Sequence, residues 1–134
     1  MPDTSAKIIA ALTAAAEGLL VPSEQDVALA LFRWPQRQQL TPARLVAALG
    51  RPPATPVETR TLDSFFAPLT RTHTALAPDE QAQAARFAAL RDLIVAHLSD
   101  PLVYRVGSVE IDLLLLGRLP NGQLVGLRTS VVET

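Results

Sequence analysis

The chain has 134 residues, a formal net charge of −1 and no cysteine, and 49% of its residues are hydrophobic. This length predicts a single domain, residues 1–134, with a core of its own. The lack of cysteine excludes disulfides and thiolate zinc sites. The basic residues are scattered singly, which argues against direct nucleic-acid binding. No apolar run approaches the roughly 20 residues of a membrane span, and the N-terminus has no secretory signal pattern, so we expect a cytoplasmic protein without a membrane partner.

Capping residues and helical spacing predict two helices in the first 50 residues. Residues 5–17 carry apolar side chains at helical spacing, and Gly18 is placed to end that helix. Thr41-Pro42 predicts the start of a second helix, with threonine as N-cap and proline at the first helical position. Gly50 ends it. Between the two, residues 27–34 predict either a buried strand or a short helix, because periodicity does not decide for so short an apolar run.

The next stretch is irregular until a long helix begins. Residues 51–60 contain three prolines and predict an irregular connector. Asp63 predicts the cap of a short helix that Pro68 stops. Residues 78–98 predict the longest helix, which Asp100-Pro101 closes. Its apolar stripe consists of Phe87, Leu90, Ile94 and Leu98.

The last third of the chain predicts β-structure. Residues 102–106 predict one strand, and residues 109–116 predict a second. One face of the second strand is apolar throughout. The other face changes from Glu110 and Asp112 to leucines, so we expect it to become covered as the strand proceeds.

The segment Pro120-Asn121-Gly122-Gln123 predicts a two-residue hairpin turn. In that register Leu119 pairs with Leu124 and Val109 pairs with Thr134, although a bulge would shift the pairing. Thr134 would then end a strand and hold its oxygens at a fixed place.

Three stretches resemble a known family. They are Gly18-Leu19-Leu20-Val21-Pro22-Ser23-Glu24, Leu62-Asp63-Ser64-Phe65-Phe66, and the run from Val103 to Asp112 that continues through Leu119-Pro120-Asn121-Gly122 to Val131-Val132-Glu133-Thr134. In order, spacing and terminus they resemble the nuclease A inhibitor family over the whole chain. The resemblance implies an α+β fold, namely a three-layer α/β/α sandwich of the plant pathogenesis-related type with a largely antiparallel C-terminal sheet.

The resemblance also implies a function. It implies a protein that is not an enzyme, needs no cofactor and inhibits a metal-dependent, sugar-nonspecific DNA/RNA nuclease. Glu24 would stand in for the scissile phosphate, and Thr134 would contact the catalytic magnesium of the partner. Glu133 would add negative field beside that contact. Thr74 and Ala75 occupy the family's second contact, where the family carries an acidic residue followed by tryptophan. We expect a monomer when the protein is free.

Two alternative functions remain open. The changed segment 71–77 motivates a protein-binding module of the same fold with an unrelated partner. Glu110 and Asp112 share a strand face and would suit a small hydrolase, but a solvated face is the better interpretation. His73 and His97 have no metal-binding spacing. The aromatic side chains are interpreted as packing residues: Trp34, Phe65, Phe66, Phe87 and Tyr104.

Overall fold

Strand β6 (Glu110–Arg118) runs through the middle of a five-stranded antiparallel sheet. The computed structural model describes residues 4–22, 25–71 and 75–133. The strand order is β3-β7-β6-β5-β4, where the other strands are β3 (Ala30–Arg33), β4 (Val57–Arg60), β5 (Ser99–Val106) and β7 (Leu124–Val132). A separate ribbon pairs β1 (Leu20–Val21) with β2 (Val27–Ala28).

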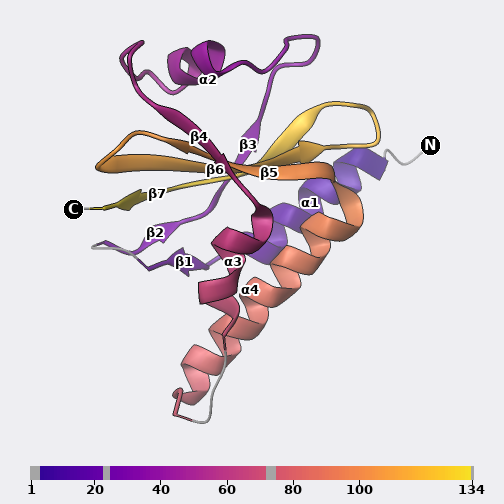
Figure 1. Ribbon diagram of the computed structural model, residues 1–134. Coiled ribbons are helices and arrows are strands. Elements are labelled where there is room, and N and C mark those ends of the chain that lie inside the picture. The colour runs from indigo at the N-terminus through magenta and orange to yellow at the C-terminus, as the bar shows by residue number, and fades with distance from the viewer. Residues whose placement is uncertain (1–3, 23–24, 72–74, 134) are drawn as a thin grey trace.

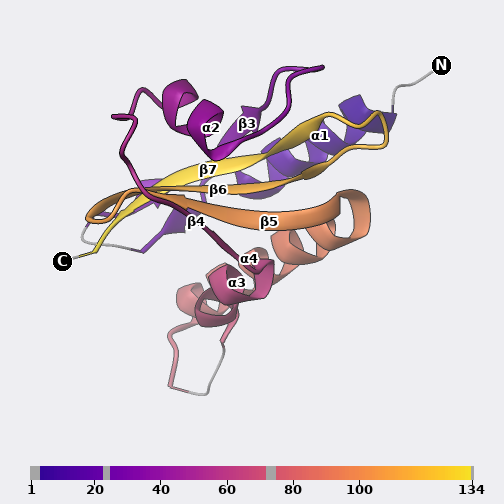
Figure 2. The ribbon, with the colours of Figure 1, turned by 45° about the horizontal axis from the view of Figure 1, so that its top comes forward.

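Helices cover both faces of this sheet. Figures 1 and 2 show α1, α3 and α4 on one side and α2 on the other. Their bounds are α1 (Thr4–Ala16), α2 (Pro42–Ala48), α3 (Leu62–Thr70) and α4 (Pro78–His97). The described part of the chain is therefore mixed α+β with an antiparallel sheet. None of its helices combines the length and apolarity that a membrane crossing needs.

The leucine run of β6 separates two cores. Leu113 and Leu115 point into the larger core, which α1, α3 and α4 cover. Leu114 and Leu116 point into a smaller core beneath α2, together with Trp34. Every residue from Ile111 to Gly117 is buried. The prediction that the second strand face becomes covered is therefore confirmed, because helix α2 supplies the cover.

The helices predicted from capping residues are present. Thr41 is the N-cap of α2, and its side chain accepts a hydrogen bond from the Arg44 amide at 3.2 Å. Gly18 and Gly50 follow α1 and α2 with φ values of 76° and 69°, which glycine adopts without the strain of a Cβ atom. In α4 the predicted apolar stripe is buried as expected, and Leu98 follows it as the C-cap.

Two segments are more regular than the sequence indicated. Within residues 27–34, Val27–Ala28 forms β2 and Ala30–Arg33 forms β3, which pairs with β7. The run is therefore strand and not helix, but its strand residues are half-buried or exposed, whereas the prediction was a buried strand. The connector predicted for residues 51–60 is wrong in its second half, because Val57–Arg60 forms β4. This strand pairs with β5 alone, at the edge of the sheet. Edge strands tolerate neighbouring prolines because only one side needs a ladder of hydrogen bonds.

Two prolines also behave differently from expectation. Helix α3 begins after Thr61, not Asp63, as its N-cap and continues through Pro68 to Thr70. The missing amide of Pro68 removes a single bond close to the helix end, so the last residues keep helical geometry. Pro101 lies inside β5, next to an irregularity in the pairing with β6. Asp100 has φ 51° there.

The hairpin between β6 and β7 differs from the predicted register by one residue. Gly117 pairs with Val125, and Ile111 pairs with Val131. The Leu119 amide donates to the Gln123 carbonyl and the Gly122 amide to the Leu119 carbonyl, at 2.9 and 2.8 Å. A two-residue loop would make Pro120 a hydrogen-bonded partner of Gln123, but proline has no amide hydrogen to give. The loop is one residue longer, and Gly122 takes the left-handed position at φ 88°.

Candidate functional site

A groove of about 480 Å³ lies where the β1–β2 ribbon, helix α3 and the end of β7 meet. We call it the chain-end groove. Residues from both ends of the sequence line it, namely Val21, Pro22, Arg60, Ser64, Phe65, Pro68, Leu69, Val103, Arg105, Leu113, Val131, Val132 and Glu133. In both views the β1–β2 ribbon and the C-terminus lie on the same side of the molecule (Figures 1 and 2).

The end of β7 forms one wall of the groove and is held at two points. The Glu133 amide donates a hydrogen bond of 2.9 Å to the Val109 carbonyl. The Arg105 side chain donates to the Glu133 carboxylate at 2.8 Å. This hydrogen bond holds the pKa of Glu133 below its usual value. The backbone is therefore fixed up to Glu133, which occupies the place opposite Val109 that we predicted for Thr134.

The end of β1 forms another wall, through Val21 and Pro22. Val21 is buried in the larger core. The Gln83 side chain donates to the Leu20 carbonyl at 3.2 Å, and the Thr129 hydroxyl donates to the Val27 carbonyl at 3.4 Å. The ribbon is thus attached to α4 and to β7. Pro22 continues from it into the groove lining.

A second groove continues from the first along α4. It has a volume of about 360 Å³, and we call it the α3–α4 groove. Pro22, Pro68 and Leu69 line both grooves. Arg71 and Leu76 line the second one, at either end of the segment where Thr74 and Ala75 were expected to act. The N-terminal end of α4 points away from the sheet and from the chain terminus (Figure 1), so this contact lies further along the same surface.

The expected contact residues stand in the structure as follows. Glu24, Thr74 and Thr134 lie outside the described residues, which include their neighbours Pro22, Gln25, Ala75 and Glu133. Gln25, Ala75 and Glu133 are exposed. The structure therefore brings the approach to Glu24 and the approach to Thr134 to one groove. Leu76, the neighbour of Ala75, lines the α3–α4 groove, which shares Pro22 with the chain-end groove.

The sequence model of the nuclease A inhibitor-like protein family matches residues 6–134. The chain belongs to this family. A search of curated proteins finds no match to the chain. The match spans α1 through the end of β7, so both walls of the chain-end groove belong to the family region.

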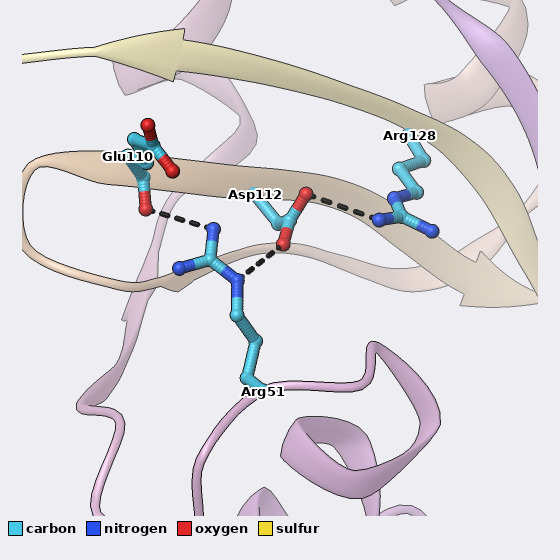
Figure 3. A network of polar contacts seen from close by, with 4 residues as sticks. All are labelled: Arg51, Glu110, Asp112 and Arg128. Carbon is cyan, nitrogen blue, oxygen red and sulfur yellow. Dashed lines mark hydrogen bonds and ion pairs between the residues drawn. The ribbon is translucent and has the colours of Figure 1, made fainter.

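An ion-pair network on the α2 face involves both acidic residues that the sequence singled out, Asp112 through its carboxylate and Glu110 through its backbone carbonyl (Figure 3). Asp112 is only 6% exposed. Its Oδ2 atom accepts from Arg51 Nε at 3.0 Å and its Oδ1 atom from Arg128 at 3.2 Å. Arg51 also donates to the Glu110 carbonyl at 2.8 Å. The prediction of a solvated face is wrong for Asp112 and holds for the Glu110 side chain, which is exposed.

This network argues against a hydrolase within the nuclease A inhibitor-like fold. Both oxygens of Asp112 already accept hydrogen bonds from guanidinium groups, so this carboxylate serves to bind arginine. Its partners were missed from the sequence for two reasons. Arg51 is 61 positions away from Asp112, and the expected hairpin register put Arg128 opposite Leu115, on the other face of the sheet. The true register sets Arg128 opposite Leu114, one diagonal step from Asp112 on the same face.

The aromatic residues contribute to packing, as predicted. Phe66 and Phe87 are buried in the larger core, and Phe65 meets Phe66 edge-on with ring centroids 4.9 Å apart. Trp34 is buried beneath α2, and its indole donates to the Gln38 carbonyl at 2.9 Å. Tyr104 is half-buried, and burial raises the pKa of its hydroxyl while the nearby Arg118 charge opposes that shift. The described residues hold no cluster of three or more His, Cys, Asp or Glu side chains suited to a metal.

Proposed function

We propose that this protein inhibits a metal-dependent, sugar-nonspecific nuclease by entering its active site with Glu24 and the chain end together. Membership of the nuclease A inhibitor-like family carries the general role. The observation that supports this particular mechanism is the chain-end groove, in which Pro22 and Glu133 line the same hollow. Two segments that start from one groove are able to reach one cleft.

The chemistry of a nuclease active site explains why oxygens suit this role. Such a site attracts phosphate with basic groups and binds Mg²⁺, which prefers oxygen ligands and keeps open or water-filled positions. In the proposal the Glu24 carboxylate takes the place of the scissile phosphate, and Thr134 offers its oxygens to the partner's magnesium. The inhibitor itself needs no cofactor and performs no catalysis.

The attachment of Glu133 gives the chain end a rigid base. Its amide bonds to β6 and its carboxylate bonds to Arg105, so less conformational entropy remains to be lost when the nuclease binds. We propose that Glu133 acts mainly through this attachment, and that its remaining negative field favours encounter with a basic cleft. The architecture, with helices on both faces of an antiparallel sheet, agrees with our proposal of a plant pathogenesis-related type of sandwich.

The segment between α3 and α4 is the part of the proposed interface where a different partner would be easiest to accommodate. Ala75 is small and exposed, whereas an aromatic anchor commonly dominates the binding energy of an interface. We propose that Thr74 and Ala75 touch the nuclease at the edge of the contact and contribute little affinity. The alternative function, a binding module with an unrelated partner, rests on this same segment.

A titration of cleavage tests the proposal. Purified protein that ends at Thr134 is added to a panel of magnesium-dependent, sugar-nonspecific nucleases, and the remaining DNA cleavage is measured. We expect cleavage by the target nuclease to stop at one equivalent of inhibitor. Cleavage by every nuclease in the panel at full rate, together with recovery of a non-nuclease protein from the source cell, would favour the alternative function.

A C-terminal extension tests the role of Thr134 separately. A tag fused after Thr134 moves the terminal carboxylate away from β7, so we expect the tagged protein to inhibit more weakly. An N-terminal tag is the matched control, because Figure 1 shows the start of α1 on the side of the molecule opposite to the end of β7. Equal inhibition by the two tagged proteins would remove Thr134 from the mechanism.

A further inference from the structure

We infer that the chain-end groove receives an apolar side chain of the nuclease, which is carried beside a carboxylate on the nuclease surface. This inference rests on the proposed function and adds to it. It names a contact between the two proposed entry points and the chemistry of the partner residue that fills it.

The position of the groove makes the contact necessary. Pro22 and Glu133 both line the groove, and each lies within two residues of a proposed contact. A partner that touches Glu24 and Thr134 at once therefore spans the groove. If the groove were covered but left empty, its lining atoms would lose dispersion contacts on one side. A protruding partner side chain restores them.

The lining of the groove is largely apolar and therefore favours an apolar side chain of the partner. Phe65, Leu69 and Val131 are partly buried hydrophobic residues that pack against the larger core, so the groove exposes the outer layer of that core. Its volume of about 480 Å³ falls within the roughly 300–1,000 Å³ of pockets that hold small ligands. The Ser64 hydroxyl donates to the Thr61 carbonyl at 2.7 Å, so this polar group is already engaged within its own helix.

The hydrogen-bond donors at the rim suit a neighbouring carboxylate. The groove lining includes two arginines, and each is paired with one acid of the chain, Arg60 with Glu58 and Arg105 with Glu133. Glu133 bonds only the Nη2 atom of Arg105, and a guanidinium has five donors in a planar fork. A partner segment with one carboxylate next to its apolar side chain accepts hydrogen bonds from the donors of Arg105 that Glu133 leaves open.

Two neighbouring positions on α3 give a matched test. Ser64 and Asp63 are both exposed, and only Ser64 lines the groove. We expect Ser64→Trp to fill the groove and to raise the inhibition constant by about tenfold or more, as when an interface side chain loses its pocket. Asp63→Trp places the same side chain outside the groove, and we expect its inhibition constant to stay close to that of the wild type. Circular dichroism checks that both variants are folded.

A second substitution tests the same contact in case Ser64→Trp does not fold. Pro68 is exposed, lines the groove and lies inside α3. Pro68→Glu restores a helical amide donor, which favours folding, and brings a charge to the apolar lining. We again expect this variant to inhibit more weakly than the wild type.

Arg60→Gln tests the neighbouring carboxylate. We expect this variant to associate with the nuclease more slowly, and we expect its association rate to depend less on salt.

The outcomes separate this inference from the function on which it rests. A wild-type protein that inhibits no nuclease contradicts the proposed function and the inference with it. A wild-type protein that inhibits, with Ser64→Trp and Pro68→Glu equally potent, overturns the apolar contact alone. An unchanged association rate in Arg60→Gln overturns the neighbouring carboxylate.

Coverage of the groove is measurable directly. The chain has no cysteine, so Ser64→Cys introduces a single thiol. We expect the bound nuclease to slow the reaction of this thiol with a maleimide, and to leave Asp63→Cys reactive. Equal reactivity of Ser64→Cys with and without the nuclease would show that the groove stays open and would overturn the inference.

Discussion

The Nη2 atom of Arg105 lies 2.8 Å from Oε2 of Glu133, so strand β5 holds the end of the chain across the intervening strand β6. Neither residue is deeply buried, since their side chains are 24% and 54% exposed. The ion pair therefore contributes little to global stability, and its effect is local. It fixes the residue that precedes Thr134.

Arg105→Gln tests this attachment. We expect the free energy of unfolding to change by less than about 1 kcal/mol, the usual limit for an exposed ion pair. We expect the inhibition constant to rise several-fold, because the chain end has to be ordered on binding. The control is Arg91→Gln, which breaks the Arg91–Asp92 pair on α4. If both variants inhibit alike, Arg105 does not position the chain end.

The ionisation of Glu133 gives a pH dependence with a definite sign. Its pKa is lowered in the folded protein, chiefly by the hydrogen bond from Arg105. The stabilisation from this pair is therefore complete above the unfolded pKa and is lost as the pH falls through the lowered folded pKa. An NMR titration of the Glu133 side chain should give a midpoint below 4.5, the ordinary value. Arg105→Gln should move the midpoint upward, and an unmoved midpoint would contradict the assigned cause.

Asp112 is predicted to matter for stability and not for inhibition. Asp112→Asn removes the charge that Arg51 and Arg128 share, and we expect a loss of about 1.5–3 kcal/mol, the range for hydrogen bonds to charged groups. Denaturant unfolding measures this loss. Glu110→Gln, at an exposed position on the same strand, should change stability by at most about 0.5 kcal/mol. A stable Asp112→Asn variant that no longer inhibits would contradict the structural role.

Gly126, in β7, is predicted to be far more sensitive to substitution than Gly122, in the preceding turn. A Cβ atom there would lie 1.6 Å from the Leu115 carbonyl oxygen, so the two central strands would have to separate. We expect Gly126→Ala to cost more than about 4 kcal/mol, which is exceptional for one substitution. Gly122→Ala is the comparison, because a Cβ there meets no atom within 4 Å. Its cost should be only the roughly 1–2 kcal/mol of a left-handed residue. Similar melting temperatures for the two variants would contradict this expectation.

Local signals in the sequence were sufficient for the helices and insufficient for the sheet. Thr41, Pro42 and Gly50 mark α2 because capping depends on residues within a few positions of each other. The register of β6 and β7 depends on one hydrogen bond that Pro120 is unable to make. The expected two-residue turn requires that hydrogen bond, so the expected register was wrong by one residue. Strand β4 was not predicted because its pairing partner, β5, lies far away in the sequence.

The candidate site shows the same division. The family resemblance pointed to Glu24 and Thr134, and membership of the family is confirmed over residues 6–134, whereas the roles of those two residues stay predictions. The chain-end groove was not predictable from spacing. The groove forms because β1, α3 and β7 meet in space. From the sequence alone, its apolar lining residues, such as Phe65 and Val131, cannot be distinguished from ordinary core residues.

Replacing Glu24 by alanine tests the central claim most directly. Inhibition of the target nuclease by Glu24→Ala is compared with inhibition by Gln25→Ala, a change at the next, exposed position. We expect Glu24→Ala to weaken the complex by about 2–5 kcal/mol, the cost of truncating one partner of a buried charge pair, and Gln25→Ala to leave it nearly unchanged. Each 1.4 kcal/mol corresponds to about tenfold in the inhibition constant. Equal inhibition constants for wild type and Glu24→Ala would contradict the proposal that an acidic loop beside the chain-end groove replaces the phosphate.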